Sequence, residues 1–532
     1  PDVQDEQTEV LEPEGAAAPT PATTLRISGR SNKGQPPERY VAMKAKTVQQ
    51  RVVMHSGGAV QIPKTWRDVL LHPESANFKA AMVEEKNSIF EMGVLEPVSD
   101  YNKKPIPTMV VYDVKVKADG GFDRYKARIV VKGYAQRVGI DFDDTWAPVS
   151  KLESVRSFLA TAATRNWTAF LNAELTEEIY IRLPEEVDGG TQVYRLRKAL
   201  YGLKQASRAW YEKLKDMMTS LGWTASDADP AFFWRETTAA GYEGVCCHVD
   251  DMLIGSTVLA NVIELKQQLG SMVEIKDLGV ASYYLAMEVQ QRSDKLLLTQ
   301  QKYISEILER FQVPQFEKKH TPMDTRQLSA EDGDLLDDQS TAKYREMTGC
   351  LMYVCRGTRP DIAYSVGVLA RYMKQPRTLH LKAAMDILKY LAATKLMGIE
   401  YGGQRDTFVG YSDSDLGGCR DDSRSTTGFA FMLNGGAVSW RSRLQPTIAD
   451  SSCEAEFMAA AEAIKEALWF KKLLPNLGVI DEDEAVMIMC DNESAEAVLR
   501  SPRINEVSKH ISRKWNFAKE SVALNEVKIE HV

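Results

Sequence analysis

This sequence of 532 residues lacks three features, and each absence excludes a class of protein. It has no run of about 18 apolar residues and no hydrophobic N-terminal segment, so we expect no membrane-spanning helix and no membrane partner. Its seven cysteines never occur with C-x-x-C spacing, which disfavours a zinc site and predicts a reduced, intracellular protein of the cytoplasm or nucleus. A formal net charge of −8 excludes a globally basic nucleic-acid-binding protein.

Basic residues are nevertheless concentrated in two stretches. Between Tyr101 and Arg137, nine lysines and arginines accompany three aspartates, a local net charge of +6. Between Arg195 and Lys215, seven basic residues accompany one glutamate, which again gives +6. Such runs are usually solvated surface, and the alternative is a pair of phosphate-binding patches.

The composition also divides the chain. Its length suits about three domains of roughly 150 residues each, with ample apolar content for their cores. Residues 1–60 differ from the rest because they are rich in Pro, Ala, Thr, Glu and Gln and have few large apolar side chains. Burial of these few apolar side chains cannot offset the conformational entropy lost on folding. We therefore predict a disordered linker over these residues.

Two adjacent carboxylates, Asp250 and Asp251, lie between two short apolar runs of high β propensity. This pattern predicts a strand hairpin with an acidic tip. Val245 and Cys247 would point to one face of the first strand and Cys246 to the other, so we expect a hairpin buried on one side. Adjacent acids usually occupy solvated turns, but at a hairpin tip they also suit a magnesium site.

In the C-terminal part, the sequence pattern predicts a different order of elements: strand, hairpin, helix, strand, helix. Asn-Gly-Gly between Phe429–Leu433 and Ala437–Trp440 is a strong hairpin signal. The segment Glu454–Leu474 has apolar residues at helical spacing, which gives a buried stripe with Glu456 at its edge. The residues of that stripe are Phe457, Ala461, Ile464 and Leu468.

Two further acids, Asp413 and Asp491, each lie at the end of a predicted strand in this part. With Glu456, they can be presented at one edge of a sheet. For the neighbouring acids Asp415, Asp450 and Glu454, we expect turn, cap or surface positions.

Eight short blocks occur in a fixed order along the chain. They are Tyr125-Lys-Ala-Arg-Ile-Val-Val-Lys-Gly-Tyr-Ala-Gln136, Ala199-Leu-Tyr-Gly-Leu-Lys-Gln-Ala-Ser-Arg-Ala-Trp210, Val249-Asp-Asp251, Thr358-Arg-Pro-Asp-Ile-Ala363, Gly410-Tyr-Ser-Asp-Ser-Asp415, Ser452-Cys-Glu-Ala-Glu-Phe457, Cys490-Asp-Asn492 and Lys509-His-Ile511. In content and order they resemble the reverse transcriptase and RNase H stretch of copia-type LTR retrotransposon polyproteins, over roughly residues 60–532.

The resemblance implies a multidomain α+β and α/β chain, in which a right-hand polymerase with fingers, palm and thumb precedes an RNase H-like mixed-sheet domain. We therefore expect a linker over 1–60, fingers and palm over 61–300, and a helical thumb and connection over 301–404. The RNase H-like domain would span 405–532 and be truncated at its C-terminus. Both ends would then be cuts in a longer polyprotein.

The resemblance also implies an activity: RNA is copied to DNA, and the RNA of RNA–DNA hybrids is cleaved, by two-metal phosphoryl transfer. The implied partners are an RNA template, a DNA primer, dNTPs, the RNA–DNA hybrid and other parts of the element's polyprotein. The implied cofactor is Mg²⁺, or Mn²⁺. The implied catalytic metal ligands are Asp250, Asp251, Asp413, Glu456 and Asp491. The implied nucleotide- or template-binding residues are Lys126, Arg128 and Gln205.

The chain departs from the family pattern at the polymerase site. Two-metal synthesis needs carboxylates from two separate strands. In the family, a strand reading approximately Gln-Met-Asp-Val-Lys supplies the first, immediately before a segment like Thr168-Ala-Phe-Leu-Asn172. Here Arg165-Asn-Trp167 runs straight into that segment, so the strand and its aspartate are missing. We predict that this copy cannot polymerise DNA.

Two other departures concern single residues. His248 stands where the family has tyrosine, which affects the family's usual contact near the primer terminus. Ser512 stands where the family has a fourth nuclease acid, so we expect weaker metal binding and slower cleavage of the hybrid. Two alternatives to a residual nuclease stay open. One is a non-catalytic relic that binds RNA–DNA duplex, and the other is an unfolded pseudogene product, which would show no cooperative melting.

Overall fold

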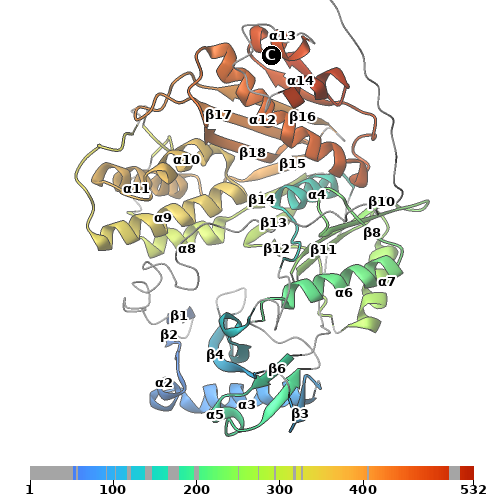
Figure 1. Ribbon diagram of the computed structural model, residues 1–532, viewed down its shortest axis with the longest axis vertical. Helices are drawn as coiled ribbons and strands as arrows, with labels where there is room; N and C mark the ends of the chain where they lie inside the picture. The colour runs from blue at the N-terminus through green and yellow to red at the C-terminus, as the bar shows by residue number, and fades with distance from the viewer. Residues whose placement is uncertain are drawn as a thin grey trace, which may run out of the picture.

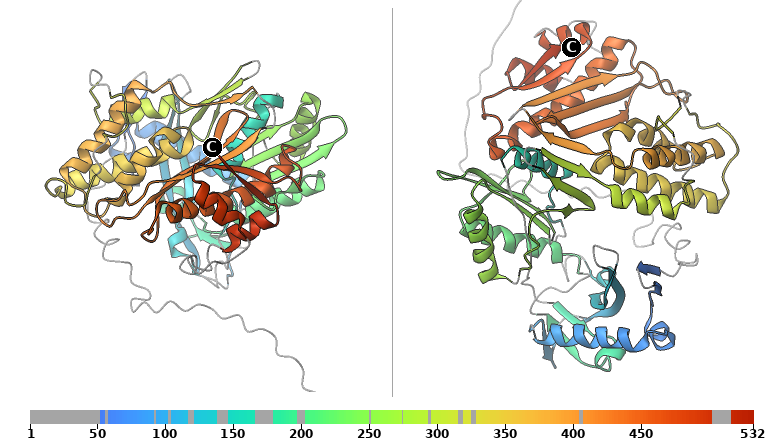
Figure 2. Two further views of the ribbon diagram at one scale, coloured as in Figure 1. Left: turned by 90° about the horizontal axis from the view of Figure 1, so that it is seen from above. Right: turned by 180° about the vertical axis from the view of Figure 1, so that it is seen from behind.

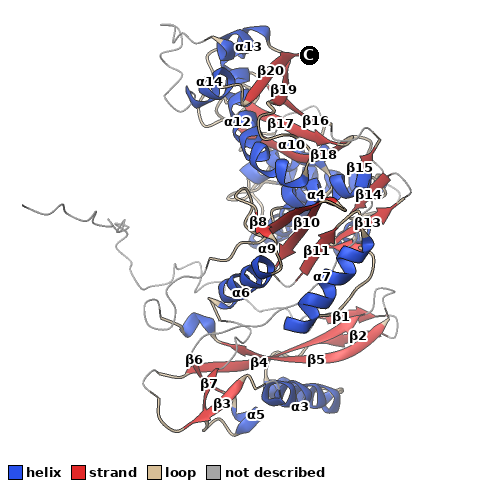
Figure 3. Ribbon diagram, turned by 90° about the vertical axis from the view of Figure 1, so that its right-hand side faces the viewer, coloured by secondary structure: helices blue, strands red, loops and turns tan. Residues whose placement is uncertain are grey.

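The structure, a computed structural model, describes residues 52–55, 58–91, 93–101, 104–116, 121–137, 146–165, 179–196, 203–249, 251–273, 275–292, 295–314, 319–324, 328–403, 407–501 and 516–532. Its larger sheets follow one another along the long axis of the molecule, from the N-terminal sheet at the bottom of Figure 3 to the C-terminal sheet at the top. Most of the predicted linker lies outside the described residues. However, β1 (Val52–His55) pairs with β2 (Gly58–Gln61), so the linker expected over 1–60 does not extend through this hairpin.

The N-terminal sheet contains a long pair of antiparallel strands, Ile106–Val116 and Phe122–Val131. Its strands, in pairing order, are β3 (Leu95–Val98), β7 (Val193–Leu196), β6 (Ile179–Arg182), β4 (Ile106–Val116) and β5 (Phe122–Val131). Alternate residues of β5, among them Ala127 and Ile129, are buried in the core that this sheet shares with α3 (Ser75–Glu91). Lys126 and Arg128 therefore lie on the opposite face of β5. The short helices of this part are α2 (Trp66–Leu71) and α5 (Glu185–Asp188).

The second sheet contains the predicted acidic hairpin. Its strands, in pairing order, are β11 (Asp251–Gly255), β10 (Gly241–His248), β9 (Phe232–Thr237) and β8 (Thr224–Ala225). Val245 and Cys247 belong to a core shared with α6 (Ala206–Ser220) and α7 (Leu259–Met272). Cys246 faces the other way, into a core shared with α4 (Leu152–Arg165). The alternation is as predicted, but the expectation of one buried side was wrong, because both faces of the hairpin are covered.

The third sheet carries a group of helices. Its strands, in pairing order, are β12 (Tyr283–Tyr284), β13 (Met287–Gln291), β14 (Lys295–Thr299) and β15 (Ile399–Gly402). The helices are α8 (Gln301–Arg310), α9 (Asp338–Gly357), α10 (Ala363–Arg371) and α11 (Thr378–Ala393), which form one yellow group in both views of Figure 2. Leu285 and Ala286 both have positive φ, of 48° and 56°, and form the tight turn between β12 and β13. Within the described residues, no helix is both long and apolar enough to cross a bilayer.

The C-terminal sheet has the RNase H-like mixed arrangement that the resemblance implied. Its strands, in pairing order, are β18 (Gly436–Leu444), β17 (Thr426–Leu433), β16 (Phe408–Ser414), β19 (Val486–Cys490) and β20 (Val527–His531). The first three are antiparallel, whereas β16, β19 and β20 are parallel. The hairpin predicted across Asn-Gly-Gly is present, and its turn consists of Asn434 and Gly435, both with positive φ.

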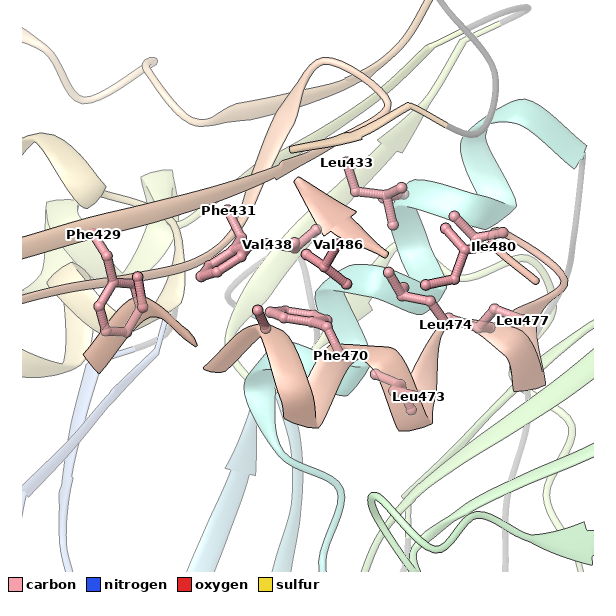
Figure 4. Packing of buried hydrophobic residues seen from close by; sticks show 14 of the residues in the cluster. Phe429, Phe431, Leu433, Val438, Phe470, Leu473, Leu474, Leu477, Ile480 and Val486 are labelled. Carbon is pink, nitrogen blue, oxygen red and sulfur yellow. The ribbon is translucent and has the colours of Figure 1, made fainter. Parts of the chain in front are cut away.

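Three helices accompany this sheet: α12 (Ser452–Leu473), α13 (Glu493–Arg500) and α14 (Asn516–Ala523). Figure 4 shows Phe470 of α12 facing Phe431 of β17, with ring centroids 5.4 Å apart and Val486 of β19 close by. Both phenylalanines are fully buried. The long helix thus packs across the sheet and joins its antiparallel and parallel halves.

A buried arginine connects α4 with the two later parts of the chain. The Arg156 guanidinium is 2% exposed and donates to the carbonyl oxygens of Val438 on β18, at 2.7 Å, and of Arg356 on α9, at 2.6 Å. It pairs with Glu153 at 3.2 Å and stacks 4.1 Å from the ring centroid of Trp440. A buried cation with these partners holds three elements in one arrangement.

We predict that Arg156→Ala lowers the free energy of unfolding by about 3 kcal/mol or more, because it breaks a buried ion pair and leaves buried carbonyl oxygens without their donor. Denaturant titration followed by circular dichroism measures this change. The matched control is Arg208→Ala, because Arg208 pairs with Glu212 at the surface, where the side chains are 37% and 57% exposed. That control should lose no more than about 1 kcal/mol. Equal losses in the two variants would contradict the role given to Arg156.

Candidate active site

Three carboxylates from distant parts of the sequence meet at one edge of the C-terminal sheet. Asp413 lies one residue before the end of β16, and Asp491 directly follows β19. These two strands pair in parallel, with Ser412 opposite Cys490, so their carboxyl ends lie side by side. Glu456 lies near the start of α12, which packs against both strands. The sequence-predicted nuclease residues are therefore brought together.

Local sequence explains the position of Glu456. The Ser451 hydroxyl caps α12 by accepting a hydrogen bond from the backbone N–H of Glu454 at 3.2 Å. The helix then carries fully buried alanines three, four and seven residues after Glu456, which is the spacing of one helix face. Such small side chains let the helix approach the sheet closely. Only 5% of Glu456 is exposed.

The Glu456 carboxylate is held at one oxygen and open at the other. Its Oε1 accepts hydrogen bonds from the backbone N–H and the hydroxyl of Ser414, at 2.9 and 2.8 Å. Its Oε2 is buried and has no hydrogen-bond partner among the described residues. Burial raises the pKa of Glu456, the bonds from Ser414 lower it, and the charges of Asp413 and Asp491 raise it. An unpartnered anionic oxygen in a negative environment fits a divalent cation.

Sequence reasoning missed two members of this site, Ser414 and Cys490. Ligand atoms of Glu456, Cys490 and Asp491 all lie within 4.8 Å of one another in the described part of the chain. Cys490 is fully buried, and this burial raises the pKa of its thiol. In the sequence, Cys490 stood out only as part of the block Cys490-Asp-Asn492, in which no ligand role was expected of it. A search for C-x-x-C spacing misses it, because its partners come from other elements.

The neighbouring acids have the structural roles that were expected of them. The Asp415 carboxylate accepts a hydrogen bond from the backbone N–H of Thr426 at 2.5 Å. The Glu454 carboxylate accepts one from the backbone N–H of Asp450 at 2.9 Å, at the start of α12. These groups stabilise the loops around the site.

Trp210 contacts the acidic hairpin of the second sheet on the face that α6 covers. The indole N–H of Trp210, on α6, donates to the carbonyl oxygen of Val249 at 2.7 Å. Val249 has a φ of 55°, a left-handed conformation that is costly for a β-branched residue. Asp251 is exposed and opens β11 opposite His248, whereas Asp250 lies outside the described residues. The indole bond thus fixes the turn that leads to Asp251.

Asp251 is the acid of the predicted polymerase site that the structure describes. The Trp167-Thr168 junction falls within residues 166–178, outside the described residues, and so does Ser512. In the part of the chain that is described, β11 pairs with β10 alone and forms an edge of its sheet.

The predicted nucleotide- and template-binding residues have different surroundings. Lys126 and Arg128 share one half-buried face of β5, and burial, followed by the charges of Arg128 and Arg124, lowers the pKa of Lys126. Gln205 is 3% exposed, and its Oε1 accepts a hydrogen bond from the side chain of Gln136 at 3.0 Å. A direct contact between Gln205 and a template would require that pair to open.

Comparison with known proteins gives matches to both halves of the chain. The family described as "Reverse transcriptase (RNA-dependent DNA polymerase)" matches residues 94–325. The retrovirus-related Pol polyprotein from transposon TNT 1-94 of Nicotiana tabacum is 35% identical over 486 residues, which are 88% of this chain and 36% of that protein. The putative transposon Ty5-1 protein of Saccharomyces cerevisiae is 30% identical over 306 residues, which are 56% of this chain and 98% of that protein.

A solved foamy viral protease-reverse transcriptase in complex with double-stranded DNA aligns with a TM-score of 0.46 and 9% identity, over 85% of this chain and 69% of that one. The present chain spans only 36% of the length of the tobacco polyprotein. It covers nearly all of the yeast protein. The chain belongs to the copia-type family of retrotransposon Pol polyproteins and contains its reverse transcriptase region.

Proposed function

We propose that the C-terminal part of this chain is a metal-dependent ribonuclease H, which hydrolyses the RNA strand of RNA–DNA hybrids. The observation that carries this proposal is the meeting of Asp413, Glu456 and Asp491 at one sheet edge, where a buried oxygen of Glu456 has no hydrogen-bond partner among the described residues. Phosphodiester hydrolysis of this kind needs carboxylates that hold two divalent ions. The mixed sheet supports the same assignment.

The residues of the site have separate roles. Asp413, Glu456 and Asp491 would hold Mg²⁺, or Mn²⁺. When bound, the ions activate water and neutralise charge on the phosphate. Ser414 orients Glu456, because both of its donors bind Oε1 and leave Oε2 directed into the cluster. Asp413 and Asp491 are exposed, so a nucleic-acid backbone can approach from their side. Ser512, in place of a fourth acid, should weaken metal binding and slow hydrolysis.

We further propose that the N-terminal part is an RNA-directed DNA polymerase by family but that this copy does not extend primers. A working enzyme of this kind would use an RNA template, a DNA primer and dNTPs. The proposal is supported by the direct run from Trp167 to Thr168, which omits the strand that carries the first catalytic aspartate in the family. Asp251, on an edge strand, cannot hold two ions without acids from a second strand.

A second candidate function is binding of RNA–DNA duplex without chemistry. The observation that favours it is the basic face of β5, where Lys126 and Arg128 lie next to each other. Phosphate contacts of this kind give affinity without sequence specificity. Both candidates predict hybrid binding, and only the first predicts cleavage.

We predict slow, Mg²⁺-dependent cleavage of a labelled RNA–DNA hybrid by the purified chain. Asp413→Asn should reduce the rate at least about tenfold, because even changes around metal ligands cost roughly 10- to 100-fold. The matched control is Asp450→Asn, the same chemical change at an exposed position outside the cluster, which should leave the rate unchanged. A folded chain that binds the hybrid but cleaves it in neither Mg²⁺ nor Mn²⁺ would favour the second candidate.

We also predict that Glu456→Gln raises the melting temperature of the metal-free chain at neutral pH. The pKa of Glu456 in the folded chain lies above its ordinary value of 4.5. Between these two pKa values the folded chain binds more protons than the unfolded chain, so the free energy of unfolding falls as the pH rises through this range. The gain should therefore vanish below pH 4.5.

Magnesium supplies the complementary measurement. At about 100 times its dissociation constant it should add about 2.7 kcal/mol to the stability of the unmodified chain and less to that of Glu456→Gln. Thermal melts in chelator and in magnesium, at two pH values, test both statements. A variant that is less stable than the unmodified chain in chelator at neutral pH would contradict the cost assigned to burying the charged Glu456 carboxylate.

A third prediction concerns the polymerase part: the purified chain should give no primer extension in either Mg²⁺ or Mn²⁺, whether or not it cleaves hybrid. Primed RNA and DNA templates with labelled primers measure this directly. Primer extension that Asp250→Asn abolishes and Asp413→Asn does not would show an active polymerase site and contradict the proposal. Extension insensitive to both changes would point to a contaminating enzyme, and the assay would then be repeated on repurified chain.

A further inference from the structure

We propose that Cys490 makes the nuclease cluster a binding site for thiophilic divalent cations such as Zn²⁺ and Cd²⁺, which it would bind together with Glu456 and Asp491. The ligand atoms of these three residues lie within 4.8 Å of one another. The consequence for hydrolysis rests on the proposed nuclease function, whereas the binding itself does not.

The position of Cys490 follows from the alternation of β19. Val486, Ile488 and Cys490 are buried on the face of the strand that belongs to the same core as α12. The thiol therefore lies on the side of the sheet from which Glu456 approaches, while Asp491 continues the chain into solvent. The site thus has a sulfur ligand inside, a carboxylate beside it and a second carboxylate at the opening.

A buried cysteine beside an acid is usually only a packing residue. The unpartnered oxygen of Glu456 argues against that simple explanation here. Ninety-five percent of Glu456 is buried, Oε1 is satisfied by Ser414, and Oε2 has no hydrogen-bond partner among the described residues. A buried anionic oxygen without a donor is costly unless a cation completes it.

The spacing suits a small tetrahedral ion. Zinc binds sulfur at roughly 2.3 Å and carboxylate oxygen at roughly 2.1 Å, which places the two ligand atoms roughly 3.6 Å apart. The upper limit of 4.8 Å in the cluster is within reach of side-chain rotation at Asp491 and Glu456. Sulfur also sets the preference, because thiolate selects soft and borderline ions whereas Mg²⁺ prefers oxygen alone.

Binding changes the protonation of one group. The ion displaces the thiol proton of Cys490 to solvent and bonds to the thiolate, as coordinating thiols do. It then occupies two of the three carboxylates that would hold magnesium. Thiophilic ions should therefore exclude Mg²⁺ from the cluster and inhibit hydrolysis.

The test is a Cd²⁺ titration of the full purified chain, followed by the ultraviolet charge-transfer absorption of the cadmium–thiolate bond. We expect one tight site in the unmodified chain. Its affinity should fall at least about tenfold in Cys490→Ala and in Glu456→Gln, which removes the charge and keeps the size. The matched control is Cys453→Ala, because Cys453 is more exposed than Cys490 and lies on α12. Cooperative melting of each variant confirms that it is folded.

The outcomes separate this inference from the proposed nuclease. Unchanged Cd²⁺ affinity in folded Cys490→Ala, or loss of the tight site in Cys453→Ala instead, would overturn the inference. Unchanged affinity in Glu456→Gln would overturn it as well, even if Cys490→Ala fails to fold. A tight site that depends on Cys490 and Glu456 in a chain without any nuclease activity would support the inference and count against the nuclease.

Discussion

The burial of one guanidinium constrains how the parts of this chain are arranged. Only 2% of Arg156 is exposed, so its donors must be satisfied by protein, and its partners come from α9 and β18 as well as from α4. Since α4 also covers the face of the acidic hairpin that carries Cys246, the second, third and C-terminal sheets share one continuous core, whereas the helices α8–α11 have a core of their own. The edge where Asp413, Glu456 and Asp491 meet is therefore built on a framework to which residues from the first third of the chain contribute.

Much of this framework could be predicted from sequence where the signal is local. The turn at Asn434-Gly435 has the backbone conformation that those residues favour. Of the apolar stripe predicted on α12, Phe457, Ala461 and Ile464 are fully buried and Leu468 is half-buried against the same core. The motif blocks contain Asp413, Glu456 and Asp491, which the structure places at the ends of two strands and near the start of a helix. The resemblance to a family supplied the roles expected of them, which local pattern alone left open.

The remaining features depend on tertiary contacts that no local pattern reports. Leu285 and Ala286 adopt a turn with positive φ that neither residue favours, and this turn separates β12 from β13. The hairpin of β10 and β11 is covered on both faces because α4 packs against it, which alternation alone could not show. Ser414 and Cys490 become part of the site only through the parallel pairing of β16 with β19 and the approach of α12.

The cluster of like charges around Glu456 also affects which substitutions such a chain would accumulate in the absence of selection. Folding alone gains nothing from three acids that repel one another around a buried oxygen without a donor, so random substitution of any one of them would be tolerated by the fold. In a pseudogene, we therefore expect the acids of this cluster to be substituted earlier than the apolar residues of the core. Here all three acids are present beside the buried apolar core that α12 shares with the C-terminal sheet.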